Sequence, residues 1–246
     1  MRGVRHAFGP TEVLAGIDLD VAPGETLALV GASGCGKSTL LELIAGLTSL
    51  QAGSIAVAGA TSPDARMASS AWMPQSDMLL PWRRAADNAA VALRMSGHDR
   101  GSSRKLATAM LERLGLAGFA GSYPDELSGG MRQRVAFART LLAGTPVLLL
   151  DEPFAALDAI TRAELQGWLV AALAGEARTT ILVTHDVEEA LFVADRIVLL
   201  TPRPASVRAV IGSPRAPAGA SRAEAIAMAE FVAARTEALE LLGAGR

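Results

Sequence analysis

A glycine-rich loop at residues 31–39 constrains this chain more than any other stretch of its sequence. It reads Gly-Ala-Ser-Gly-Cys-Gly-Lys-Ser-Thr and fits the pattern G-x-x-x-x-G-K-[ST]. An apolar run at residues 27–30 precedes it, and a helix-like run at residues 39–47 follows it. A phosphate-binding loop requires this strand–loop–helix context, so the sequence predicts that the chain binds a nucleoside triphosphate.

Each residue type in this loop has a physical reason. Glycines let the backbone wrap closely enough for successive N–H groups to point inward at phosphate, and the helix N-terminus adds its positive end. We expect Lys37 to reach the outer phosphates and the Ser38 hydroxyl to help hold Mg²⁺. The flanking elements argue against a turn that binds nothing. The nucleotide-binding candidates here are Gly31, Ser33, Gly34, Cys35, Gly36, Lys37, Ser38 and Thr39.

Composition narrows the class of protein. The chain has 246 residues, half of them hydrophobic, which suits one α/β domain with an inserted subdomain or two small domains. Its net charge of −2 argues against a mainly electrostatic nucleic-acid binder. A single cysteine excludes an internal disulfide and fits a reducing compartment. No run resembles a transmembrane helix or a signal peptide, so we expect a cytoplasmic protein, with attachment to a membrane partner left open.

Short apolar runs predict further strands. They lie at residues 55–58, 147–150, 180–183 and 197–200. Helix-like segments separate most of these runs, which predicts a largely parallel sheet covered on both faces.

Strand signals fade between residues 76 and 142. Helix-like segments lie there at residues 88–95, 104–114 and 131–142. We therefore predict a helical subdomain at residues 76–142, inserted in a nucleotide-binding core formed by residues 1–75 and 143–201.

Residues 202–246 are predicted to form a short linker and a C-terminal helix. Residues 202–217 are rich in Pro, Arg and Ala, a poor composition for a core. Ser221 can cap a final helix that runs to about Leu242.

The apolar run at residues 147–150 ends in two adjacent acids, Asp151 and Glu152. Neighbouring residues of an extended strand point to opposite faces, so each acid can take a different task. Asp151 suits a second contact to Mg²⁺, and Glu152 suits polarising the attacking water. An apolar run that ends in acids is common, and its position after a phosphate loop strengthens this interpretation.

A second anion site is predicted at Ser128, Gly129 and Gly130, directly before a helix that starts near Met131. A hydroxyl, bare backbone donors and a helix N-terminus together favour a negative ligand. One chain therefore carries two half-sites for phosphate.

Residues 127–131, Leu-Ser-Gly-Gly-Met, resemble the LSGGQ signature of the ATP-binding cassette family, with Met131 in place of the final glutamine. The resemblance covers nearly the whole chain, because further motifs of the family follow in order. Gln75 matches the glutamine that senses the nucleotide and the membrane partner, and residues 156–158 match the dimer-contact loop. His185 matches the switch histidine, which bonds the γ-phosphate.

Phe8 stands where the family places an aromatic ring against adenine. The alternative for Phe8 is a strand residue packed in the core. By itself His185 would be read as an ordinary histidine at a strand end, and its position before an acidic helix start favours the switch role.

The resemblance implies an α/β fold: a P-loop NTPase core with a mostly parallel sheet, a small antiparallel β portion and an inserted helical subdomain. It implies ATP and Mg²⁺ as cofactors and an ATPase coupled to transmembrane transport. The residues it assigns are Glu152, His185 and Gln75 for catalysis, Ser38, Gln75 and Asp151 for the metal, and Ser128, Gly129 and Gly130 with Phe8 and the phosphate loop for the nucleotide.

The resemblance also implies partners. Two copies would form a head-to-tail homodimer in which the phosphate loop of one copy faces Ser128 of the other, with two ATP molecules between them. Integral-membrane permease subunits would hold the dimer at the cytoplasmic face of the inner (plasma) membrane. A periplasmic or lipid-anchored solute-binding protein would act indirectly, and no nucleic acid is expected.

Two segments are similar to import ATPases of the nitrate, sulfonate and taurine group: Leu-Leu-Pro-Trp at residues 79–82 and Thr-Pro-Arg-Pro at residues 201–204. Importers of pyrimidine vitamin precursors look much alike, and an exporter ATPase or a soluble cassette protein are further alternatives.

The apolar and arginine-rich segment at residues 76–84 has two readings, subdomain core or a groove that docks a membrane subunit.

Overall fold

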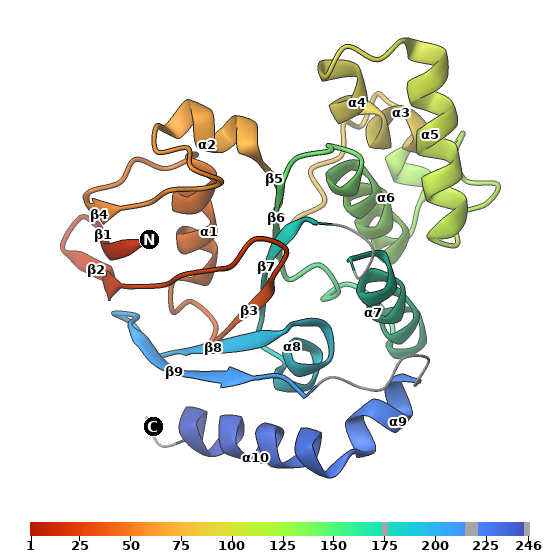
Figure 1. Cartoon of the computed structure of the whole chain (residues 1–246). Helices are drawn as coiled ribbons and strands as arrows, with labels where there is room; N and C mark the ends of the chain where they lie inside the picture. The colour runs from red at the N-terminus through yellow and green to blue at the C-terminus, as the bar shows by residue number, and fades with distance from the viewer. Residues whose placement is uncertain (174–176, 215–220, 244–246) are drawn as a thin grey trace.

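A six-stranded sheet runs through the middle of the molecule (Figure 1). The computed structural model describes residues 1–173, 177–214 and 221–243. The strands, in spatial order, are β5 (Ser70–Met73), β6 (Val147–Asp151), β7 (Thr179–Thr184), β3 (Thr26–Val30), β8 (Arg196–Leu200) and β9 (Val207–Gly212). All neighbours are parallel except β8 and β9, which are antiparallel. The predicted mostly parallel sheet is confirmed.

The central strands are buried along their whole length, which explains their continuous apolar sequence. Side chains of β3 alternate between two cores. Ala28 and Val30 belong to a core that includes the helical subdomain, whereas Leu27 and Leu29 face a second core that includes α1 (Lys37–Ala45). The sheet is therefore packed on both faces, and β3 holds the glycine-rich loop at its carboxyl end.

A second, three-stranded antiparallel sheet has the order β2 (Thr11–Ile17), β1 (Arg2–Phe8) and β4 (Ala52–Ser54). It confirms the small antiparallel portion. The strand predicted at residues 55–58 is wrong: β4 ends at Ser54, and only a bridge joins Val57 to Ala60. Positive φ angles at Ala58 (49°) and Gly59 (83°) turn the chain there, although Val57 still lies in the core.

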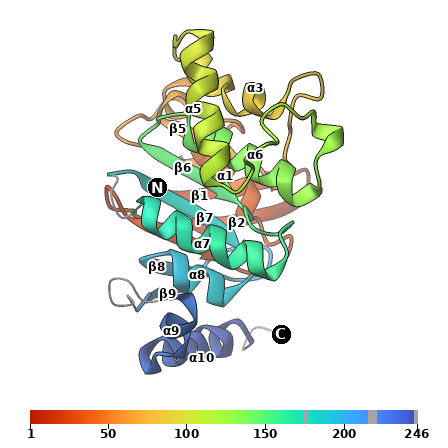
Figure 2. The same ribbon diagram turned by 90° about the vertical axis from the view of Figure 1, so that its right-hand side faces the viewer.

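The helices between β5 and β6 form a separate lobe at the top of Figures 1 and 2. They are α3 (Ala85–Ala89), α4 (Val91–Met95), α5 (Arg100–Arg113), the 3₁₀ turn η1 (Pro124–Glu126) and α6 (Gly129–Leu141). The predicted helix at residues 88–95 is two helices that meet at Ala90. Asn88 joins this lobe to the preceding loop, since its side chain bonds both the N–H and the C=O of Leu80 at 2.8 and 3.1 Å.

The remaining helices cover the sheet. They are α1, α2 (Pro63–Ser69), α7 (Ala159–Leu173), α8 (Val187–Val193), α9 (Arg222–Ala227) and α10 (Ala229–Gly243). In both views α9 and α10 lie at the end of the molecule opposite the helical lobe (Figure 2). No helix in the described residues is both long enough and apolar enough to cross a membrane.

The C-terminal segment differs from the sequence prediction in two ways. Residues 207–212 are not a linker but the edge strand β9, in which Val and Ile favour a strand; it pairs with β8 and packs Ala209 and Ile211 against the core. Residues 215–217 of the predicted linker lie outside the described residues. Ser221 does cap a helix, with Glu224 completing the capping box, but α9 ends at Met228, whose backbone is extended.

Candidate functional site

The glycine-rich loop depends on two glycines with positive φ, Gly34 (72°) and Gly36 (122°). Gly36 immediately precedes α1, and a Cβ there would lie 2.8 Å from a methyl carbon of Val13 and 3.0 Å from one of Leu14. Any other residue would be strained and would clash with β2. The loop is thus held against the antiparallel sheet, with the N-terminus of α1 at its end.

Lys37 is buried, and its ammonium group donates to the backbone carbonyls of Gly31 at 2.8 Å and Ala32 at 3.0 Å. These bonds use two of its three donors. The side chain therefore folds back over its own loop, where the charge lies beside the backbone donors that would hold phosphate.

Asp151 is the last residue of β6 and is 3% exposed. Burial raises the pKa of its carboxyl group, while a hydrogen bond from Ser38 and the charge of Lys37 act in the opposite direction. The structure thus brings together Ser38 and Asp151, two of the three residues predicted to hold Mg²⁺. A hydroxyl and a carboxylate are the hard oxygen ligands that Mg²⁺ prefers, so this donor set fits the ion.

Glu152 has a left-handed backbone, with φ at 47°, and its N–H donates to Val183 at 2.9 Å. Asp151 and Glu152 therefore diverge because the strand ends between them, not because they alternate on one strand, as the sequence had suggested. A positive φ at a residue of this size costs about 1–3 kcal/mol and is found mainly at functional sites.

His185 lies beside Glu152, with its Nδ1 atom 3.2 Å from the carboxylate. The histidine occupies the short turn between β7, which ends at Thr184, and α8, whose N-cap is Asp186. Asp186 accepts bonds from two backbone N–H groups of α8, at 2.8 and 3.1 Å. The strand end and the capped helix fix the backbone on both sides of His185.

A cavity of about 140 Å³ lies at the phosphate loop and reaches Glu152. Its lining residues are Ser33, Gly34, Gly36, Lys37, Ser38, Thr39, Gln75, Glu152 and Arg203. The structure therefore brings Gln75 and Glu152 to the phosphate loop, as predicted. Arg203 is the residue that sequence reasoning missed, because nothing in residues 201–204 indicates that they return to residue 34.

Phe8 lies at the end of β1, 55% exposed, with the ring of His6 packed edge-on at 4.8 Å. An exposed ring at the end of a strand does not fit the core reading of this residue. Phe8 is not among the residues that line the phosphate-loop cavity, and stacking on adenine stays a prediction.

Ser128 is the N-cap of α6, and its hydroxyl accepts a hydrogen bond from Met131 at 3.3 Å. Gly130 packs against the segment after the two acids, since a Cβ there would lie 3.2 Å from Leu157. None of residues 128–130 is among those that line the phosphate-loop cavity of the same chain. Within one copy, the second anion site is therefore separate from the first.

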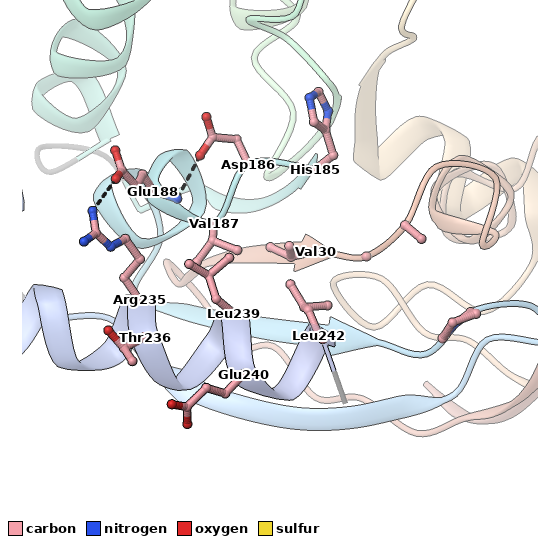
Figure 3. Close-up of a pocket in the computed structure, with 14 residues that line it drawn as sticks. Val30, His185, Asp186, Val187, Glu188, Arg235, Thr236, Leu239, Glu240 and Leu242 are labelled. Carbon is pink, nitrogen blue, oxygen red and sulfur yellow. Dashed lines mark hydrogen bonds and ion pairs between the residues drawn. The ribbon is translucent and has the colours of Figure 1, made fainter. Parts of the chain in front are cut away.

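A larger cavity, of about 870 Å³, lies between the His185 turn and α10 (Figure 3). Glu188 of α8 and Arg235 of α10 form an ion pair at 2.6 Å on one side of it. Next to Arg235, Leu239 extends from α10 toward Val187 of α8. The C-terminal helix thus packs against the helix that follows His185.

Comparison with known proteins identifies the family of this chain. A family model described as "ABC transporter" matches residues 14–155. The chain is 50% identical over 199 residues to the aliphatic sulfonates import ATP-binding protein SsuB 1 of Rhodococcus jostii (strain RHA1), covering 81% of this chain and 77% of that protein. It is 44% identical over 200 residues to the taurine import ATP-binding protein TauB of Escherichia coli O157:H7, covering 81% and 78%.

A solved structure shows the same fold. It is described as a dimeric, post-hydrolysis state of the ATP-binding cassette MJ0796 bound to ADP and Pi. The two chains are 27% identical, the TM-score is 0.79, and the match covers 87% of this chain and 98% of that one. Fold, motif order and sequence similarity agree, and the chain belongs to the ABC transporter family.

Proposed function

We propose that this chain is the ATP-hydrolysing subunit of an importer that takes up a sulfonate, either an aliphatic sulfonate or taurine. The observation that carries the ATPase assignment is the Glu152–His185 pair, 3.2 Å apart, beside the phosphate loop. The import assignment is supported by relatives at 44–50% identity whose names specify import of aliphatic sulfonates or taurine. These names do not favour a vitamin-precursor importer, an exporter or a soluble cassette protein.

In this proposal each group of the site has one task. Lys37 and the loop N–H groups bind the phosphates, and Ser38 and Asp151 hold Mg²⁺, with Gln75 as a further ligand. When held there, Mg²⁺ would supply positive charge against the phosphate oxygens. Glu152 orients the attacking water and accepts its proton, and His185 holds the Glu152 carboxylate and the γ-phosphate in place.

The second half-site needs a second copy of the chain. Ser128, Gly129 and Gly130 form an anion site that lies outside the phosphate-loop cavity of their own copy. In a head-to-tail dimer these residues of one copy would cover the γ-phosphate bound by the other. The solved structure described as dimeric and bound to ADP and Pi supports the formation of a dimer. ATP would then close the dimer, and hydrolysis would open it.

The loop before α3 is proposed to bind the permease. Met78 is 60% exposed and Trp82 is 71% exposed, which favours the docking reading of residues 76–84 over the core reading. Beside Trp82 lies a cavity of about 320 Å³ whose lining includes several arginines: Arg83, Arg84, Arg94 and Arg100. An apolar helix with acidic residues at its end would suit this surface. Through it the dimer would lie at the cytoplasmic face of the membrane.

Reconstitution tests this function. The chain would be purified with the permease subunits that accompany it, placed in proteoliposomes, and supplied with a solute-binding protein carrying an alkanesulfonate, taurine, nitrate or a pyrimidine vitamin precursor. We expect a sulfonate-loaded binding protein to stimulate both ATP hydrolysis and uptake. Stimulation by nitrate or the pyrimidine alone would contradict the substrate assignment, and hydrolysis that ignores the binding protein would contradict import.

A further inference from the structure

Arg203 lies at the rim of the phosphate-loop cavity, in the Thr-Pro-Arg-Pro segment at residues 201–204, and none of the roles described above is assigned to it. Its side chain lines the cavity together with Lys37, Ser38, Gln75 and Glu152. One guanidinium nitrogen donates to the backbone carbonyl of Gly34, inside the glycine-rich loop. A residue far along the sequence thus touches the loop that is predicted to hold phosphate.

The segment that carries Arg203 is fixed at both ends. The Ser206 N–H donates to the Thr201 hydroxyl at 2.9 Å, and the Ser206 C=O accepts from the Thr201 N–H at 3.0 Å. Ala205 then pairs with β2, donating to Val13 at 2.8 Å and accepting from Ala15 at 2.9 Å. The same strand contacts the loop at Gly36. These bonds fix the backbone on both sides of Arg203 and place its side chain beside the phosphate loop.

The charge of Arg203 is not neutralised by a carboxylate in the described residues. Its one side-chain hydrogen bond there goes to Gly34, and the side chain is exposed. A guanidinium group has five N–H donors in a planar fork, and this fork matches the geometry of phosphate oxygens. A carbonyl oxygen uses one donor, so most of the fork and the full charge are available to a ligand.

We propose that Arg203 is a further phosphate ligand, whose guanidinium group binds the terminal phosphates of ATP while it holds the loop through Gly34. This inference rests on the proposed function, because it assumes that ATP occupies the cavity. Gln75 and Glu152, which line the same cavity, are the groups assigned to the γ-phosphate end of the nucleotide. ATP should therefore depend on Arg203 more than ADP does.

Three substitutions separate phosphate binding from a purely structural role. Arg203→Ala removes both the charge and the bond to Gly34. Arg203→Gln keeps a donor for the Gly34 carbonyl but has no charge, and Arg203→Lys keeps the charge. Arg104→Ala, on the exposed surface of α5, is the control for loss of a positive charge elsewhere. The dissociation constants of ATP and ADP would be measured by calorimetry for each purified variant.

We expect Arg203→Ala and Arg203→Gln to weaken ATP binding about tenfold, the usual size of one charge-assisted hydrogen bond. ADP affinity should change less, and Arg203→Lys and Arg104→Ala should stay close to wild type. Wild-type ATP affinity in Arg203→Gln would overturn the proposal, because a bond to Gly34 would then be the whole role. Equal losses for ATP and ADP would also overturn it. If the wild-type chain itself does not bind ATP, the proposed function fails instead.

Discussion

At the scale of single residues, the site depends on a few side chains whose surroundings are unusual. Glu152 combines a left-handed backbone with a carboxylate that is 17% exposed and contacts His185. Asp151, its neighbour, is buried beside Ser38. These two acids are adjacent in sequence, yet one is suited to a metal ion and the other to water.

Glu152→Gln tests the role of the carboxylate as a general base. The amide keeps the shape of the side chain but cannot accept a proton, so ATP hydrolysis should fall by about 10²–10⁴-fold while ATP still binds. The variant should also accumulate as an ATP-bound dimer, measured by size-exclusion chromatography with ATP and Mg²⁺. Glu164→Gln, at an exposed position of α7, is the matched control. Turnover near the wild-type rate would refute the assignment.

The buried Asp151 carboxyl group should make the stability of the folded chain depend on pH. Burial raises its pKa in the folded chain, and a raised folded pKa adds stability at low pH that is lost as pH rises through that pKa. The Asp151→Asn side chain cannot ionise. Without nucleotide, the variant should therefore have a higher melting temperature than the wild type at about pH 8, and this difference should disappear in acid. Differential scanning calorimetry of both proteins across pH measures the two melting temperatures.

The same substitution changes a residue that we propose holds Mg²⁺. We therefore expect Mg²⁺ to tighten ATP binding less in Asp151→Asn than in the wild type, and less in the wild type as acid protonates Asp151. A variant that responds to Mg²⁺ as strongly as the wild type would show that Asp151 does not hold the ion.

At the scale of elements, side chains of helix α6 bond to the loop that follows Gln75. Arg132 forms an ion pair with the Asp77 carboxylate at 2.9 Å. Arg139 donates to the backbone carbonyls of Asp77 at 2.8 Å and Met78 at 2.9 Å. The loop proposed to bind the permease is thus bonded to the helix that begins at the second anion site. Movement of one should shift the other.

Arg139→Ala tests this coupling. Two backbone carbonyls lose their donor, so the chain should be destabilised by about 1–3 kcal/mol. ATP hydrolysis by the isolated subunit should persist, because Arg139 is not part of the phosphate site, whereas stimulation by the permease complex should fall severalfold. Arg104→Ala, on the exposed surface of α5, is the control for a lost arginine in the same lobe. Stimulation at the wild-type level would exclude the coupling.

The elements also show where sequence reasoning succeeds. The strand β3, the loop and α1 were predictable, because residues 26–45 carry their own local signals. The edge strand β9 was missed because prolines and arginines around it mask a short β-branched run. Arg203 was missed for another reason: its contact with Gly34 exists only after β8 and β3 are paired. The positive φ of Glu152 likewise depends on tertiary packing that no local pattern encodes.

At the scale of the whole molecule, the two predicted anion sites of one copy are separate, and we propose that a complete site requires two copies. The head-to-tail arrangement can be tested by mixing defective chains. Lys37→Ala removes the phosphate-loop cation, and Ser128→Arg blocks the second anion site. Each variant alone should be inactive. An equal mixture should recover about a quarter of the wild-type ATPase rate, because half the dimers then contain one intact site.

The recovered activity should rise and fall with the mixing ratio and be greatest at equal amounts. A double variant that carries both substitutions on one chain is the control, since it offers no intact half-site to a partner. If the mixture stays inactive while mixed dimers form, the site is not shared between copies in this way.

The order of strands in the sheet has a consequence for biosynthesis. The strand β3 is complete by residue 30, but its two neighbours are β7 and β8, which end at residues 184 and 200. During synthesis on the ribosome, both edges of β3 therefore stay unpaired until β7 and β8 have emerged. A ribosome stalled before residue 200 should release a chain that cannot retain nucleotide. The order of synthesis thus delays ATP binding until the strands that pair with β3 have been made.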